Sequence, residues 1–300
     1  MTGDKPLLGI TLMLGFCIMA PLGDSLAKLL GSRMDVGQLV LIRFATQFLI
    51  LTPLVWLAGR SLFVPRALFP TIVARAVLHI LGIGMMFEAL KYLPLADAVA
   101  IAFVMPFIML ALGHYFLGEA VGARRIIACG VGFIGTLMVV QPSFAAVGWP
   151  ALLPLGVAIV FAFFMLLTRK VAKALDPIDL QATSAGLALV MAVPIVVAGH
   201  TFDVTGATLT WPRVDDWSLV IMLGLLGTLA HLAMTWSLRF APSATLAPMK
   251  YLEIPAAAVI GWLVFSDFPN GLALIGIVVT VLAGLYIVMR ERATMQPTQE

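Results

Sequence analysis

Residues 89–98 read ALKYLPLADA, and residues 237–246 read SLRFAPSATL. At an offset of 148 positions the two stretches share a basic residue, an aromatic residue, a proline and an alanine in the same order. Further matches follow at an offset of 149: Pro106 with Pro255, Gly122 with Gly271, and Gly135 with Gly284. The pattern indicates that one unit occurs twice, and it predicts the two units at 1–142 and 143–300.

The composition predicts that lipid surrounds most of the chain. Apolar residues make up 62% of the sequence and charged residues only 11%, and the mean hydropathy is +1.08. Soluble domains contain roughly 25% charged residues, so this chain has too few to cover a water-soluble globule. The net charge of +3 comes from so few charges that it does not indicate a nucleic-acid partner. The two cysteines, Cys17 and Cys129, give neither a disulfide framework nor a metal-ligand spacing. We therefore expect no metal, no cofactor and no nucleic-acid partner.

Apolar runs of the length that crosses a bilayer as a helix recur along the whole chain. Breaks of charge, glycine or proline divide them into ten predicted spans: 7–30, 37–58, 68–90, 94–117, 122–141, 148–170, 178–199, 216–239, 243–265 and 271–289. Runs this long and without alternation exclude a β-barrel. The predicted fold class is an all-α integral membrane protein.

The basic residues predict how these helices are oriented. With a cytoplasmic N-terminus, 11 Lys and Arg residues fall on the inner side, against three on the outer side: Arg33, Lys91 and Arg213. The positive-inside rule then places both termini in the cytoplasm. Five helices in each unit are an odd number, so the second unit enters the membrane from the opposite side. Inverted repeats of this kind are typical of secondary transporters, whose substrate site lies near the midplane between the repeats.

One part of the first unit, residues 92–140, carries a familiar pattern. It includes Pro94, Ala96, Pro106, Gly118, Glu119, Gly130 and Gly135. On these residues the chain resembles the drug/metabolite transporter superfamily of the EamA type, over roughly 7–290. The second unit departs from the pattern, because Asp267 stands, one residue out of register, where a glutamate is usual. Within the superfamily the chain is most similar to the YddG-type bacterial exporters of aromatic and other neutral amino acids.

The resemblance implies secondary active export of such amino acids or related small metabolites. Transport would proceed by alternating access across the bacterial inner membrane, with protons as a candidate coupling ion. The working unit is expected to be a monomer, with the substrate in a central cavity between the repeats. Other readings stay open: transport of another metabolite class in either direction, a lipid flippase, or a receptor that transports nothing. An enzyme is not expected, because the sequence lacks the usual motifs for metal or nucleophilic catalysis.

The stretch PMKYLEIP, 248–255, places Lys250 and Glu253 inside a predicted apolar helix. Residues three apart lie close on a helix surface, so the two charges could neutralise each other as an ion pair. Charged groups in a span also mark substrate sites. In that case Lys250 would bind a substrate carboxylate, and Glu253 would be its counter-charge or the partner of a substrate amine. The first unit has Ile101 and Val104 at these positions, so the fold does not require the charges and we favour binding.

Other polar and aromatic residues inside the spans are further candidates. His79, near the centre of the third span, is either an inert core histidine or a proton relay or carboxylate donor. Trp236 and Tyr251 are candidates for the pocket wall. Asp24 and Arg43 lie at equal depth on the first two helices, which predicts that they pair, as a lock between helices or an outer gate.

Two prolines, Pro106 and Pro255, occupy matched positions in the fourth and ninth spans. A proline inside a helix removes a backbone hydrogen bond and kinks the helix. Two symmetric kinks could serve as hinges that let the inner and outer halves of the bundle move separately. They could equally be static kinks, and the hinge is the interpretation that we favour.

Overall fold

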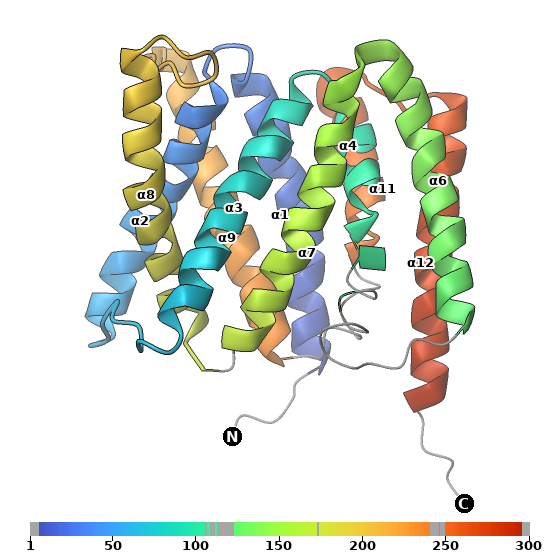
Figure 1. The fold of residues 1–300 in the computed structure, drawn as a ribbon, viewed down its shortest axis with the longest axis horizontal. Helices are drawn as coiled ribbons and strands as arrows, with labels where there is room; N and C mark the ends of the chain where they lie inside the picture. Colours follow the sequence, from blue (N-terminus) through green and yellow to red (C-terminus); the bar gives the residue numbers. More distant parts are fainter. Residues whose placement is uncertain are drawn as a thin grey trace, which may run out of the picture.

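Helices stand side by side across the whole width of the protein in the computed structural model (Figure 1). The structure describes residues 6–105, 107–108, 112, 123–172, 174–240, 246 and 250–295. Within them lie ten α-helices: α1 (Pro6–Leu30), α2 (Val36–Leu57), α3 (Phe69–Leu90), α4 (Leu95–Ala102), α6 (Ala123–Val147), α7 (Leu153–Val171), α8 (Pro177–Thr201), α9 (Trp217–Phe240), α11 (Glu253–Phe265) and α12 (Gly271–Met295). Two short 3₁₀ helices, η1 (Trp149–Leu152) and η2 (Val214–Asp216), precede α7 and α9. The all-helical class is confirmed.

The lengths of the helices suit a membrane. Seven of the described helical segments are long and apolar enough to cross one, and α11 and the first part of α12 are shorter apolar helices. Large apolar side chains point outward along these helices, for example Phe133 and Ile134 on α6 and Ile195 on α8. An outward apolar surface of this extent is stable in lipid and not in water. The chain is therefore a multi-pass membrane protein.

The order of neighbours in the bundle fits two repeats related by a two-fold axis. Helix α1 packs on α9 and on α11, and its counterpart in the second half, α7, packs on α3 and on α4. Helix α2 packs on α9, while its counterpart α8 packs on α3. In the remaining close pairs a helix packs on its own counterpart from the other half: α2 on α8, α4 on α11 and α6 on α12. Figure 1 shows that α1 begins where α12 ends, whereas α7 begins at the opposite end, so the second half is inverted.

The N-termini of α2 and α8 show the same symmetry in detail. Asp35 and Asp176 are the N-cap residues of these two helices, both in extended backbone conformations. Asp35 accepts hydrogen bonds from the amide and the hydroxyl of Thr208, in the connection between α8 and α9. Asp176 forms an ion pair of 2.9 Å with Arg60, in the connection between α2 and α3. Each half thus holds the helix start of the other half, at opposite ends of the bundle.

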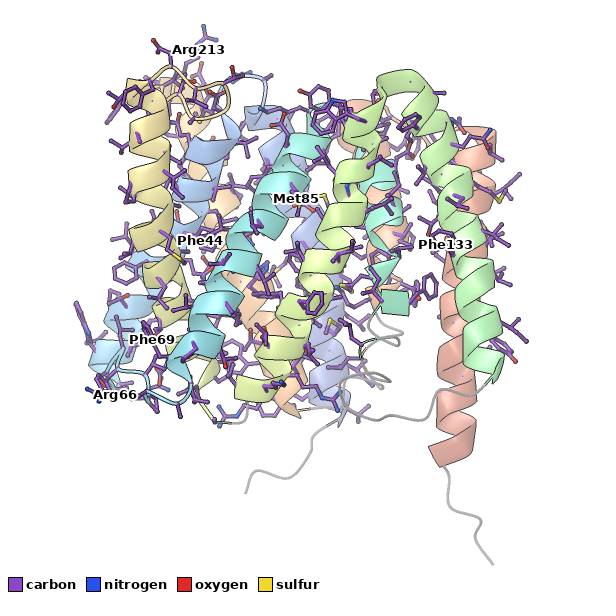
Figure 2. The ribbon with its side chains drawn as sticks, in the orientation of Figure 1. Phe44, Arg66, Phe69, Met85, Phe133 and Arg213 are labelled. Atoms are coloured by element: carbon purple, nitrogen blue, oxygen red, sulfur yellow. The ribbon has the colours of Figure 1, made fainter. Side chains whose placement is uncertain are left out.

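The distribution of basic residues over the two ends agrees with the predicted orientation, although nothing in the structure identifies the cytoplasmic side. Arg66 lies at the end where α1 begins and Arg213 at the opposite end (Figure 2). Arg60 and Arg239 share Asp176 at the same end as Arg66, with 2.9 and 3.5 Å between the charged atoms. A cytoplasmic location of both termini stays a prediction.

The fourth and ninth predicted spans differ most from the described helices. Helix α4 ends at Ala102 and α11 begins at Glu253, so each described helix covers only the part of its span farthest from the chain termini. Pro255 is the third residue of α11 and lies in its first turn, where a missing amide leaves no helical hydrogen bond broken. The expected kink inside a continuous helix is therefore not seen at Pro255, and Pro106 lies outside the described residues. A hinge at either proline stays a prediction.

Candidate central cavity

The bundle encloses a cavity of about 770 Å³, open mouth included, between the two halves. Helices α1, α3, α4, α7 and α9 form its walls, together with Arg43 of α2 and the segment from Lys250 to Glu253 that leads into α11. Both units contribute, as expected of a site between inverted repeats.

Most of the cavity wall is apolar and aromatic. Four phenylalanines from both halves of the chain line it: Phe16, Phe87, Phe103 and Phe161. Three methionines line it as well: Met19, Met86 and Met105. Aromatic faces stack on planar ligands, and methionine adapts its shape to irregular ones. The wall can therefore hold a ring or another apolar group of a small molecule.

The predicted pair Lys250 and Glu253 lies in this wall without forming an ion pair. Lys250 is 6% exposed and Glu253 is 8% exposed. The ammonium lies 5.2 Å from the ring of Phe16 and 5.9 Å from the ring of Phe103, and it makes no hydrogen bond to any described residue. One carboxylate oxygen of Glu253, Oε2, is buried without a partner in the described structure. A self-neutralising pair, one of the two interpretations, is thus not the arrangement that the structure contains.

Asp24 and Arg43 line the same cavity from α1 and α2. Arg43 is 6% exposed, and its Nη2 lies 2.8 Å from Nδ1 of His231 and 3.3 Å from the carbonyl oxygen of Gly227, to which it donates. A side chain at position 227 would collide with the guanidinium, so glycine is what lets it approach α9. Within the described residues Arg43 forms no ion pair with Asp24. Their equal depth was predicted, but the direct contact is not present, and a gating role stays a prediction.

His79 lies one layer behind the cavity wall, on α3. Its ring stacks on His231 with 4.4 Å between centroids, and on Phe164 of α7 with 4.6 Å. It is fully buried, and neither ring nitrogen has a hydrogen-bond partner among the described residues. Phe44 meets it edge-on at 5.0 Å. The structure thus places His79 against a cavity residue rather than in the cavity, and its role stays a prediction.

Arg75 extends this stack farther from the cavity, and it was not singled out from the sequence. Its guanidinium lies 4.5 Å from the ring centroid of Phe164, on α7. It donates to the hydroxyls of Thr168 at 2.8 Å and of Ser184 at 2.6 Å. The side chain is fully buried and has no carboxylate partner in the described part of the chain. Its charge inside a predicted span was the only signal in the sequence that could have identified it.

The two predicted aromatic candidates do not reach the cavity wall. Tyr251 is buried and packs on Phe103, with 5.4 Å between ring centroids. Trp236 packs against a cluster around Leu51 and Val55, on the α2 side of the bundle. Neither side chain lines the cavity, so a role of Tyr251 or Trp236 in binding stays a prediction. The aromatic residues that approach Lys250 are Phe16 and Phe103.

A buried amide network fixes the helices beside the cavity. Gln47 of α2 donates to the backbone carbonyl of Gln181 at 2.9 Å. Gln181 of α8 donates to the carbonyl of His231 at 3.0 Å and to the hydroxyl of Thr235 at 2.8 Å, both on α9. In the described structure no three metal-binding side chains gather in one place.

Comparison with known proteins identifies the class to which this architecture belongs. The model of the EamA-like transporter family matches the chain twice, over 7–141 and 148–290. A solved structure with the plain title "Crystal structure of protein" shares the fold, with a TM-score of 0.65 and 17% sequence identity over 97% of this chain and 98% of its own.

Three bacterial relatives are named for what they carry. An S-adenosylmethionine uptake transporter of Rickettsia felis is 25% identical over 98% of this chain and 97% of its own length. A riboflavin transporter of Rhizobium johnstonii is 32% identical over 72% and 69%. A pseudopaline exporter, CntI, of Pseudomonas aeruginosa is 26% identical over 87% and 88%. These names support the EamA resemblance but not the finer expectation of an amino acid exporter of the YddG type.

Proposed function

Because the chain belongs to the EamA-like transporter family, we propose that it is a secondary transporter of a small zwitterionic metabolite. The metabolite carries an α-amino acid group and an aromatic or apolar portion, and it crosses the membrane through the central cavity by alternating access. One observation supports this proposal above the others. Two cations, Arg43 and Lys250, and two acids, Asp24 and Glu253, line one cavity, and no two of these described side chains form an ion pair.

Charges that lack partners in a membrane interior are unfavourable. Removing an ion from water costs several kcal/mol even after the protein relaxes, and an opposite charge with good geometry offsets that cost. The four charged groups of the cavity add up to zero when both acids are ionised. A zwitterion is also neutral overall, and its carboxylate and ammonium give the cations and the acids partners in a single binding event.

The chemistry of candidate substrates can be compared with this wall. Amino acids with aromatic side chains offer a zwitterion and a ring, and they remain candidates. S-adenosylmethionine, named for one relative, also combines an α-amino acid group with an aromatic base. Riboflavin has a large ring system but neither a carboxylate nor an ammonium group, so the four charges would stay without partners. The cavity therefore favours amino acids and their derivatives over flavins.

The setting that we propose is the inner membrane of a bacterium, with both termini in the cytoplasm. The positive-inside distribution of Lys and Arg and the bacterial sources of the relatives support it. A single chain surrounds the cavity, which supports a monomer as the working unit. A non-enzymatic role is consistent with the transporter family. Relatives are named both for uptake and for export, so the direction of net transport has to be measured.

Flux through proteoliposomes tests this proposal. The purified full chain is reconstituted, and entry of labelled S-adenosylmethionine, L-phenylalanine and L-tryptophan is followed with and without a pH gradient. We expect saturable entry of at least one of them, which the unlabelled compound and other zwitterions inhibit. Dependence of that entry on the pH gradient would assign protons as the coupling ion. Protein-free liposomes are the control, and absence of saturable flux for all three compounds, or scrambling of a labelled phospholipid alone, would contradict the proposal.

A further inference from the structure

We propose that Arg43 binds the carboxylate of the substrate, and that His231 is a positioning residue that holds the Arg43 guanidinium in the cavity wall. This inference rests on the proposed function and adds the subsite to it. Lys250, the other cation of the cavity, then has a different task. The proposal also replaces the predicted pairing of Arg43 with Asp24 by a direct role in recognition.

The guanidinium of Arg43 is held by hydrogen bonds at Nη2, and its Nη1 packs against Gly227. Only Nη2 makes hydrogen bonds, to the carbonyl of Gly227 and to Nδ1 of His231. Nε and Nη1 make none to any described residue, and neither belongs to the buried atoms that lack a partner. Since the side chain lines the cavity, its remaining N–H groups, at Nε above all, are the donors that a ligand there can reach. A guanidinium whose orientation is fixed by other contacts selects a carboxylate better than a freely rotating ammonium does.

His231 fixes the orientation of that guanidinium. Arginine can only donate, so Nδ1 of His231 must accept, and the neutral ring carries its proton on Nε2. The backbone of His231 is itself held, because its carbonyl accepts from Gln181 and from Thr235. A protonated ring would instead direct an N–H at the Nη2 of Arg43. The positioning role of His231 therefore requires the neutral imidazole.

Positive charges gather around His231. Cations face it from several elements: Arg43 on α2, Arg75 on α3 behind the stacked ring of His79, and Lys250 ahead of α11. The two acids of the cavity, Asp24 and Glu253, make no contact with the imidazole among the described residues. Helix α7 contributes only aromatic rings, Phe161 and Phe164. Three nearby positive charges disfavour a fourth, so the stack is suited to positioning Arg43 and not to carrying a proton.

Lys250 lacks this support. Its ammonium lies between the rings of Phe16 and Phe103 and has no hydrogen-bond acceptor to orient it. A flexible point charge in that position attracts an anion without selecting a planar one. We therefore assign recognition of the carboxylate to Arg43 and general stabilisation of negative charge in the cavity to Lys250.

A pair of ligands that differ only at the carboxyl group tests the assignment. Binding of L-phenylalanine and L-phenylalaninamide, and of L-tryptophan and L-tryptophanamide, to the purified full chain is measured by calorimetry. For the wild type we expect each acid to bind at least tenfold more tightly than its amide. In Arg43→Gln the ratio should fall to within about twofold, while Lys250→Gln should weaken the acid only a few-fold and leave it the tighter ligand. Partial misfolding of a variant would lower its affinities for the acid and for the amide by the same factor, so it would not change the acid-to-amide ratio.

Two variants of His231 separate positioning from packing. Asn has an oxygen near the place of Nδ1, so His231→Asn should keep the acid-to-amide ratio, whereas His231→Leu should lose it. Arg43→Lys, which keeps the charge without the planar fork, should give an intermediate ratio and serves if Arg43→Gln does not fold. A tenfold ratio retained in Arg43→Gln or Arg43→Lys, or lost in Lys250→Gln, would overturn the inference and leave the proposed function intact. If the wild type binds neither these amino acids nor S-adenosylmethionine, the proposed function itself fails.

Discussion

Replacing Lys250 with methionine removes one charge and keeps the length of the side chain. If the ammonium attracts the substrate's negative end without a direct hydrogen bond, the variant loses an interaction of about 0.5–1 kcal/mol. That loss corresponds to a dissociation constant raised about 2- to 5-fold. The aromatic wall is unchanged, so the apolar part of the substrate should still bind weakly.

The effect of the same substitution on stability should be small or favourable. The ammonium has no ion pair in the described structure, and its contacts with Phe16 and Phe103 contribute about 0.5–2 kcal/mol each. Removing a buried charge recovers several kcal/mol of desolvation, which offsets that loss. Breaking a buried ion pair would instead destabilise by about 3–5 kcal/mol. At about 2–4 °C per kcal/mol, that corresponds to a fall of roughly 6–20 °C in the unfolding temperature.

Calorimetric titration of the zwitterion that binds the wild type most tightly, together with thermal unfolding in the same detergent, measures both effects. Lys28→Met is the matched control, because Lys28 lies outside the cavity and forms an ion pair of 3.1 Å with Asp267. The control should bind the ligand like the wild type and change stability by no more than about 1 kcal/mol. An unfolding temperature that falls by more than 6 °C in Lys250→Met, with affinity unchanged, would refute the reasoning. It would instead support the alternative interpretation, in which Lys250 forms a structural ion pair with Glu253.

Three further outcomes follow from the structure. Gly227→Ala should weaken zwitterion binding at least tenfold in a titration, because the added Cβ would displace Arg43. The control Gly23→Ala, in the same cavity, should bind like the wild type, since its Cβ would lie 3.9 Å from Leu226. Equal affinities of the two variants would exclude the role of Gly227. Gly276→Ala should lower the unfolding temperature by several degrees without changing affinity. The added Cβ would lie 2.5 Å from the carbonyl oxygen of Gly135, where α12 packs on α6. An unchanged unfolding temperature would show that α6 and α12 can move apart without loss of stability. Burial raises the pKa of Asp35, but the two hydrogen bonds from Thr208, together with the charge of Lys91 and the amide of Gly206, outweigh it, so the pKa lies below its ordinary value. The Asp35–Thr208 contact should therefore stabilise the protein above the pKa of an unfolded aspartate, about 3.9, and lose that effect as pH falls through the lowered value. Thermal unfolding between pH 7 and pH 3 should show a difference between wild type and Asp35→Asn that becomes smaller toward the acid end, and a difference independent of pH would contradict this sign.

The sequence predicts the helices well because the bilayer imposes their length. Apolar runs bounded by charge, glycine or proline locate most ends to within a few residues, as α2 and α3 show. Inversion of the second half follows from the repeat around Lys91 and Arg239 together with an odd number of helices in each unit. The matched N-caps Asp35 and Asp176 add detail that weak sequence similarity does not reveal.

The candidate site is less predictable, because sequence gives the depth of a residue in the membrane but not the direction in which it points. Lys250 and Glu253 would be neighbours on one continuous helix, yet a turn at 251–252 precedes α11 and separates them. Arg43 and Asp24 have equal depth, but α9 approaches α2 and provides His231 and Gly227 as contacts. Such choices depend on which helices are neighbours, and the repeat alone does not determine that.

The most direct test of the central claim compares one zwitterion with its two half-charged forms. Affinities of the wild type for L-phenylalanine, L-phenylalaninamide and N-acetyl-L-phenylalanine are measured in one buffer, with riboflavin as a neutral aromatic compound. If the unpaired charges of the cavity recognise a zwitterion, L-phenylalanine should bind at least tenfold more tightly than either half-charged form, and riboflavin should not compete with it. Equal affinity for all three, or tighter binding of riboflavin, would contradict the claim that these four charges define the substrate.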